Sequence, residues 1–160
     1  MTYFSTPGKE NLDLTMALAK KRTEELGLGD VVIASTTGFT AKKAIEVFKD
    51  TGAKLTFVGT GRERFPADLL QELQSKGCHV CFSHEIQYDY PDAVRAAYRR
   101  FCEGMKVAVE IGMIATQQGY VSIDKDIVSI GKWDTAIVVR PATFGHFEEL
   151  KIRELLCKPR

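Results

Sequence analysis

The sequence lacks an excess of charge of either sign. Its 22 Lys and Arg residues are balanced by 21 Asp and Glu residues, which leaves a formal net charge of +1 at pH 7. Such a balance creates no field over the whole molecule that would attract nucleic acid or an anionic membrane surface. We therefore expect no nucleic-acid partner and no membrane partner, and any bound anion must be held by local groups.

Long hydrophobic runs are also missing. The longest runs, such as residues 55–61 and 136–139, fall far short of the roughly 18 apolar residues that a membrane-spanning helix needs. The first ten residues contain neither the basic start nor the apolar stretch of a secretory signal. These absences predict a cytoplasmic protein.

Cysteine is scarce and unevenly spaced. The chain has four cysteines, Cys78, Cys81, Cys102 and Cys157, a pattern more typical of reduced thiols than of a disulfide framework. Cys78, Cys81 and the nearby His84 resemble a metal cluster by residue type, but on a strand residues three apart point to opposite faces. We therefore expect no metal site. No serine, cysteine and histidine arrangement indicates a nucleophilic triad, so catalytic residues stay unassigned.

What is present is the composition and pattern of an α/β domain. The chain of 160 residues is 44% apolar and 27% charged, which suits one folded domain. Short β-branched segments at residues 30–35, 54–58 and 78–82 alternate with amphipathic helical patterns, such as that of residues 39–49. Alternation of this kind predicts parallel strands joined by helices.

The second half of the chain predicts a change of strand direction. A long helical region runs from about Asp92 to Gln118, with a break near Gly104, and two β segments follow at residues 126–130 and 134–140. Only three residues separate these segments, too few for a parallel crossover, so the strands must be antiparallel if they are paired neighbours. The tail, residues 144–156, has apolar residues at roughly helical spacing and is predicted as a helix.

The best candidate site is a hydroxyl-rich segment between the first parallel strand and its helix, Ser35-Thr36-Thr37-Gly38-Phe39-Thr40. It combines four hydroxyls, a glycine that permits close backbone approach, and the positive end of a helix. In open parallel sheets, ligands bind beyond the carboxyl ends of the strands, where the strand order reverses. We predict that the segment binds phosphate. The alternative is that Ser35 or Thr37 only caps the helix.

Three further groups are candidates for the same ligand. The turn Gly131-Lys132-Trp133 offers a positive charge and a flat apolar face, although Trp133 could equally pack on the domain surface. Gly59-Thr60-Gly61-Arg62 ends the second strand and offers N–H groups and a guanidinium. Glu110 lies in an apolar helix, where a carboxylate must find donors. Its role as a ligand contact or as a structural hydrogen-bond acceptor stays open.

The order of the elements and residues 30–41 and 126–140 resemble the C-terminal domain of pyruvate kinase. Several other motifs resemble more closely the stand-alone proteins of the pyruvate kinase C-terminal-like family. Those motifs are Tyr3-Phe4, Pro7-Gly8-Lys9-Glu10-Asn11, Asp134-Thr135-Ala136, Arg140-Pro141-Ala142 and residues 151–160. The likeness extends over nearly the whole chain.

The resemblance implies a single domain over residues 1–160, with a three-layer α/β/α sandwich and a five-stranded mixed sheet of order 3-2-1-4-5. The last strand would be antiparallel. It also implies a pocket in which residues 35–40 hold a phosphate, the turn 131–134 closes over it, and flavin mononucleotide (FMN) can bind. Because the catalytic barrel lies outside the likeness, no pyruvate kinase activity is expected. A flavin-dependent enzyme and an oligomerising module without a ligand are the alternatives, and a homo-oligomer is a possible partner state.

Overall fold

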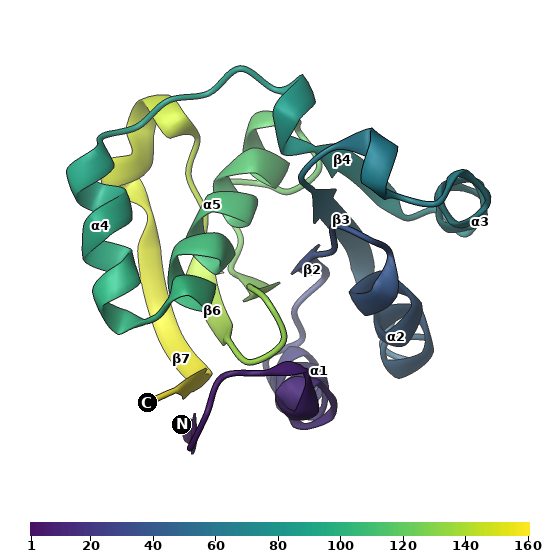
Figure 1. Ribbon diagram of the computed structural model, residues 1–160, viewed down its shortest axis with the longest axis horizontal. Coiled ribbons are helices and arrows are strands. Elements are labelled where there is room, and N and C mark those ends of the chain that lie inside the picture. Colours follow the sequence, from purple (N-terminus) through teal and green to yellow (C-terminus); the bar gives the residue numbers. More distant parts are fainter.

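The computed structural model describes all residues of the chain, Met1–Arg160. Its centre is one mixed sheet of seven strands in the order β1-β7-β6-β5-β2-β3-β4 (Figure 1). The strands are β1 (Thr2–Phe4), β2 (Asp30–Ala34), β3 (Lys54–Gly59), β4 (His79–Phe82), β5 (Ile127–Ile130), β6 (Ala136–Arg140) and β7 (Lys151–Pro159).

Five of these strands confirm the predicted order. Strands β4, β3, β2 and β5 are parallel neighbours, and β6 pairs with β5 in the antiparallel direction. The short connection reverses the chain through a hydrogen bond of 2.9 Å from the Gly131 N–H to the Thr135 carbonyl. The three-residue spacing therefore predicted the inverted strand correctly.

The sheet has seven strands, so the expectation of five was wrong. Strand β7 pairs antiparallel with β6, and β1 pairs in parallel with the end of β7. The helix predicted for residues 144–156 is also wrong: residues 144–149 form short 3-10 turns, and β7 follows. Leu155 and Leu156 pack on opposite faces of the sheet. A strand allows this because successive side chains alternate, whereas a helical stripe does not.

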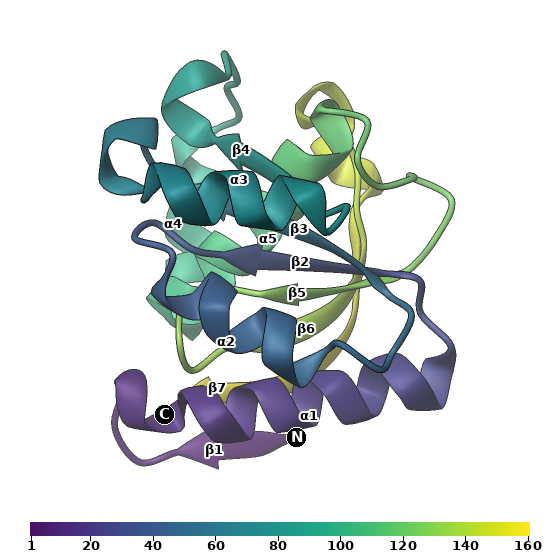
Figure 2. The same ribbon diagram turned by 90° about the vertical axis from the view of Figure 1, so that its right-hand side faces the viewer.

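Helices cover both faces of the sheet (Figure 2). The helices α1 (Leu12–Leu26), α2 (Phe39–Val47) and α3 (Ala67–Ser75) pack on one face, and α4 (Asp92–Phe101) and α5 (Glu103–Gln117) lie on the other. The predicted long helix thus breaks at Cys102, whose backbone is extended and whose Sγ accepts a hydrogen bond from the Met105 N–H. None of the helices combines the length and the apolar character needed to cross a membrane.

Strand β2 shows why a nearly continuous apolar run marks the centre of the sheet. Val31 and Ile33 belong to the core beneath α1, α2 and α3, whereas Val32 belongs to the core beneath α5. All three side chains are fully buried. Both faces of the strand are covered, so its carboxyl end is held rigidly at the edge of the sheet, where the next segment begins.

Candidate functional site

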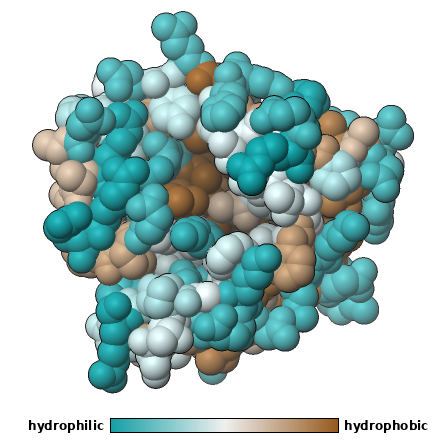
Figure 3. All heavy atoms as spheres, viewed as in Figure 1, coloured by the Kyte–Doolittle hydropathy of each residue, from teal (hydrophilic) through white to brown (hydrophobic).

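A cavity of about 900 Å³ lies beyond the carboxyl ends of β2 and β3. It is bounded by the start of α2, one side of α5 from Glu103 to Ile114 and the turn between β5 and β6, and its floor is apolar. Figure 3 shows the hollow as a hydrophobic depression ringed by hydrophilic residues. The floor consists of Ala34, Val58, Val107, Ile111 and Ile114. The cavity therefore occupies the edge of the sheet at which a ligand was predicted.

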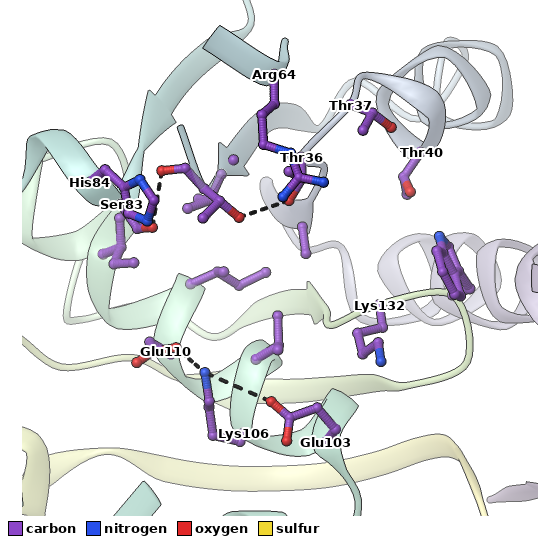
Figure 4. Close-up of a pocket in the computed structure, with 18 of the residues that line it drawn as sticks. Thr36, Thr37, Thr40, Arg64, Ser83, His84, Glu103, Lys106, Glu110 and Lys132 are labelled. Carbon is purple, nitrogen blue, oxygen red and sulfur yellow. Dashed lines mark hydrogen bonds and ion pairs between the residues drawn. The ribbon is translucent and has the colours of Figure 1, made fainter. Parts of the chain in front are cut away.

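The hydroxyl-rich segment contributes four side chains to the cavity, those of Thr36, Thr37, Phe39 and Thr40 (Figure 4). Ser35 does not line it. Its buried hydroxyl accepts a hydrogen bond of 3.1 Å from the Ala41 N–H, so the alternative role as a helix cap holds for this residue. The hydroxyls of Thr36 and Thr60 lie 3.0 Å apart, which ties the segment to the end of β3.

Gly38 is outside the cavity lining as well and has a backbone role. It precedes α2 in the left-handed conformation, with a φ of 80°. A Cβ at this position would lie 2.4 Å from Leu69 Cδ2. The glycine therefore lets the chain turn sharply into α2 while α3 packs against it.

The start of α2 presents a run of free backbone donors. The N–H groups of residues 36–40 make no hydrogen bond within the protein. The Ala41 N–H bonds to Ser35, and the Lys42 N–H is the first to bond to a backbone carbonyl, that of Gly38. Thr37 forms no capping bond. Five consecutive donors at the positive end of a helix favour an anion.

Three cations that form no ion pair line the cavity. They are Lys9, Arg64 and Lys132. Lys9 Nζ lies 5.1 Å from the ring centroids of both Phe39 and Trp133. Lys132 Nζ lies 5.8 Å from the Trp133 ring. These contacts hold positive charge beside the free donors of α2 without neutralising it.

The turn 131–134 contributes two of its predicted residues. Lys132 and Trp133 line the cavity, and Trp133 also packs against the core, so its packing role is observed and its contact with a ligand stays a prediction. Gly131 instead packs against α5, where a Cβ would lie 2.1 Å from the Gly104 carbonyl oxygen. Asp134 Oδ2 accepts a hydrogen bond of 3.1 Å from the Gly8 N–H, which fixes the segment carrying Lys9 to this turn.

Arg62 was predicted at this site, and the structure places it elsewhere. Its guanidinium forms two hydrogen bonds of 2.8 Å to Glu85 and lies over the Phe82 ring. The bonds from Arg62 lower the pKa of the Glu85 carboxyl. Gly59 and Thr60 line the cavity, but Gly61 does not. Because residues 62–64 form a 3-10 turn, side chains two positions apart point in different directions, and Arg64 reaches the cavity instead.

Glu110 lines the opposite wall, and its hydrogen bonds fit the predicted structural role, while contact with a ligand stays a prediction. Its side chain is 12% exposed and lies 2.6 Å from Lys106 Nζ and 3.7 Å from Arg95 Nε. The Tyr90 hydroxyl lies 3.4 Å from Glu110 Oε1 and donates a hydrogen bond to it. Burial raises the pKa of Tyr90, and the negative charge of Glu110 adds to that effect.

Much of this wall was missed from the sequence. Besides Lys9 and Arg64, the cavity is lined by Ser83, His84, Tyr88, Arg95, Arg99, Glu103 and Lys106. Positions 103, 106, 107, 110, 111 and 114 recur at the spacing of one helical face, and extending this pattern from Glu110 would have found the residues on α5. Arg95 and Arg99 lie four residues apart on α4, but no local signal brings that helix to the cavity.

The cysteines and the histidine near them are not gathered into one cluster. All four cysteines are free, and no group of three His, Cys, Asp or Glu side chains is placed to hold a metal ion. Burial raises the pKa of the Cys81 thiol to about 12. The Ser83 hydroxyl donates a hydrogen bond of 3.3 Å to the Thr60 carbonyl rather than to His84.

A comparison with protein-family models finds none that matches the chain.

Proposed function

We propose that the cavity binds a phosphate-bearing small molecule, with the phosphate at the start of α2. The observation that carries the proposal is the run of free N–H donors at residues 36–40, beside three unpaired cations. Hydroxyls of Thr36, Thr37 and Thr40 add neutral donors on the same side. A site of this kind attracts an anion through local groups. Local attraction is needed because a chain of net charge +1 creates no strong field over the whole molecule.

FMN is the ligand that we propose for this cavity. A volume of about 900 Å³ lies within the usual range for sites of small molecules and cofactors. The donors of residues 36–40 would hold the phosphate, and the apolar floor with Trp133 would contact the flat ring system. When bound, a flavin supplies hydride-transfer chemistry. The residues of this chain bind and shield it, and we propose a carrier or regulatory role.

We further propose that the chain is a single three-layer α/β/α domain related to the pyruvate kinase C-terminal-like proteins, without pyruvate kinase activity of its own. Support comes from the strand order around β2, the inverted β6, and helices on both faces of the sheet. Thr36, Thr37, Phe39 and Thr40 line the same cavity as the β5–β6 turn, which is consistent with the phosphate pocket that this relationship implies.

Mass spectrometry of small molecules released from the purified protein tests the ligand. A Thr37→Val, Thr40→Val double variant removes two cavity hydroxyls that make no hydrogen bond in the protein, and it should lose most of a copurifying phosphate compound. The exposed Thr6, which does not line the cavity, provides the control Thr6→Val. Equal occupancy in all three proteins would show that the ligand is held elsewhere.

Absorbance and scattering separate the alternatives. Flavin absorbance in the preparation supports FMN, and reduction of that flavin by a nicotinamide nucleotide would favour a flavin-dependent enzyme over a carrier. A stable oligomer that takes up no phosphate compound would favour the interaction module. Light scattering with and without FMN measures that outcome.

A further inference from the structure

The two walls of the cavity differ in how their charges are used. The part of the lining outside α4 and α5, here called the α2 wall, is formed by the start of α2, the segments of Lys9 and Arg64, and the β5–β6 turn with Lys132, and none of these three cations is paired with a carboxylate. The wall at α4 and α5 carries a line of alternating charges, which we call the charge ladder. The ladder consists of Arg99, Glu103, Lys106, Glu110 and Arg95. In Figure 4, Glu103, Lys106 and Glu110 lie across the cavity from Thr36, Thr37 and Thr40.

Every member of the charge ladder has a partner of opposite charge. Arg99 Nε lies 2.9 Å from Glu103 Oε2, and Lys106 Nζ lies 4.0 Å from Glu103 and 2.6 Å from Glu110. Arg95 Nε lies 3.7 Å from Glu110.

Arg95 is also bound from outside the ladder. Its guanidinium lies 2.7 Å from Asp92 and 3.6 Å from Asp89, both of which are exposed. The three cations of this wall therefore face four carboxylates, those of Asp89, Asp92, Glu103 and Glu110. Unlike the α2 wall, this wall has no spare positive charge.

The pairing determines which chemical groups each wall accepts. A phosphate at the charge ladder would have to approach Glu110, whose side chain is only 12% exposed, so water screens the repulsion poorly. An uncharged polar group meets no such penalty. It can accept a hydrogen bond from Lys106 or donate one to a free lone pair of Glu110.

Building on the proposed phosphate site, we propose that the charge ladder selects phosphomonoesters. The single phosphate lies at the start of α2, and an uncharged polar body extends over the apolar floor to the ladder. The carboxylate of Glu110 excludes a second phosphate at that end. Glu110 is therefore a specificity-determining residue, and sugar or nucleoside bisphosphates are rejected.

Isothermal titration calorimetry with two matched ligand pairs tests this specificity. The pairs are fructose 6-phosphate with fructose 1,6-bisphosphate, and adenosine 5′-monophosphate with adenosine 3′,5′-bisphosphate. The wild type should bind each monophosphate at least as tightly as its bisphosphate. Glu110→Gln keeps the size of the side chain, removes the negative charge and frees Lys106. In at least one pair it should shift the affinity ratio toward the bisphosphate by about tenfold, the size expected for one poorly screened like-charge contact.

A matched control separates this effect from the loss of any helix ion pair. Glu72 lies 2.7 Å from Lys76 Nζ in an i,i+4 pair on α3, outside the cavity. Glu72→Gln should leave the affinity ratio unchanged. A shift toward the tighter binding of a bisphosphate cannot come from misfolding, so the Glu110 variant gives an interpretable result even if its stability falls.

The outcomes distinguish this inference from the phosphate site itself. If the wild type binds monophosphates but Glu110→Gln leaves the ratio within twofold of the wild type in both pairs, the ladder does not set specificity. The same holds if the wild type binds either bisphosphate more tightly than the matched monophosphate. If no phosphate compound binds the wild type, the proposed function fails and this inference fails with it.

Discussion

Replacement of Gly38 by alanine should destabilise the fold and disturb the phosphate site together. Gly38 has a φ of 80°, and a Cβ there would lie 2.4 Å from Leu69 Cδ2 and 3.4 Å from Pro66 Cδ. The left-handed backbone costs a non-glycine residue about 1–2 kcal/mol. Leu69 is 2% exposed, so its methyl group cannot move without repacking the core. Overpacking of this kind adds about 1–3 kcal/mol.

Gly77→Ala is the matched control, because it introduces the backbone strain without the clash. Gly77 has a φ of 79°, and nothing lies within 4 Å of a Cβ built there. In urea unfolding, we expect Gly38→Ala to lose about 2 kcal/mol more of the free energy of unfolding than Gly77→Ala does. For a chain of this size, the melting temperature should fall by about 4–8 °C more.

The binding readout links the packing to the site. Any shift of the first turn of α2 displaces the N–H donors of residues 36–40, so Gly38→Ala should also bind FMN or inorganic phosphate more weakly, whereas Gly77→Ala should not. Equal destabilisation by the two substitutions would refute the argument that contact with α3 holds this turn. If Gly38→Ala is destabilised but binds phosphate as the wild type does, the packing of Gly38 does not position the N–H donors of residues 36–40.

Three further predictions concern charged residues. Arg64→Ala should weaken phosphate binding by about 1 kcal/mol in calorimetry, with Arg62→Ala, outside the cavity, as the unaffected comparison. The bond from Arg22 lowers the pKa of Glu154 in the folded state below its ordinary value of 4.5. The ionised Glu154 therefore stabilises the fold above pH 4.5, and this stabilisation is lost as the pH falls through the lower folded-state pKa. In urea unfolding from about pH 6 to about pH 3, the free energy of unfolding of Glu154→Gln should fall less than that of the wild type. Lys132→Gly should stabilise the fold by about 0.5–1 kcal/mol in the same assay while weakening phosphate binding. A Lys132→Gly protein that is both less stable and weaker in phosphate binding than the wild type would contradict this prediction.

The parts of the fold that were predictable depend on local chemistry. The apolar run of β2 and the three-residue connection before β6 each carry their constraint within a few residues. Strand β7 was not predictable in this way. Its nine residues pair with β6 and, at their end, with β1 from the other end of the chain. The pairing with β1 joins the two ends of the chain and leaves no local signal, and the apolar residues of the tail recur at a spacing that also fits a helix.

The candidate site also has a part that local sequence predicts and a part that it does not. Thr36, Thr37 and Thr40 follow directly from the strand–turn–helix pattern, because the carboxyl end of β2 and the start of α2 fix their position. Of the charge ladder, Glu103, Lys106 and Glu110 could have been found from the cavity-facing side of α5, whereas Arg95 and Arg99 join it only because α4 packs against α5. The exchange of Arg62 for Arg64 depends on the rotation of a single 3-10 turn, which the sequence pattern does not specify.

The backbone at Lys132 connects the fold to the proposed site. Every other residue with a positive φ is a glycine, whereas Lys132 has a φ of 65°. A lysine in this conformation is strained relative to glycine, and such strain persists only where neighbours hold the backbone. The contact between Gly131 and Gly104 and the hydrogen bond from Gly8 to Asp134 supply that constraint. A glycine would have satisfied the turn with less strain, so the lysine contributes something that the turn does not need. If the proposed phosphate site is correct, its unpaired charge at the cavity wall is that contribution.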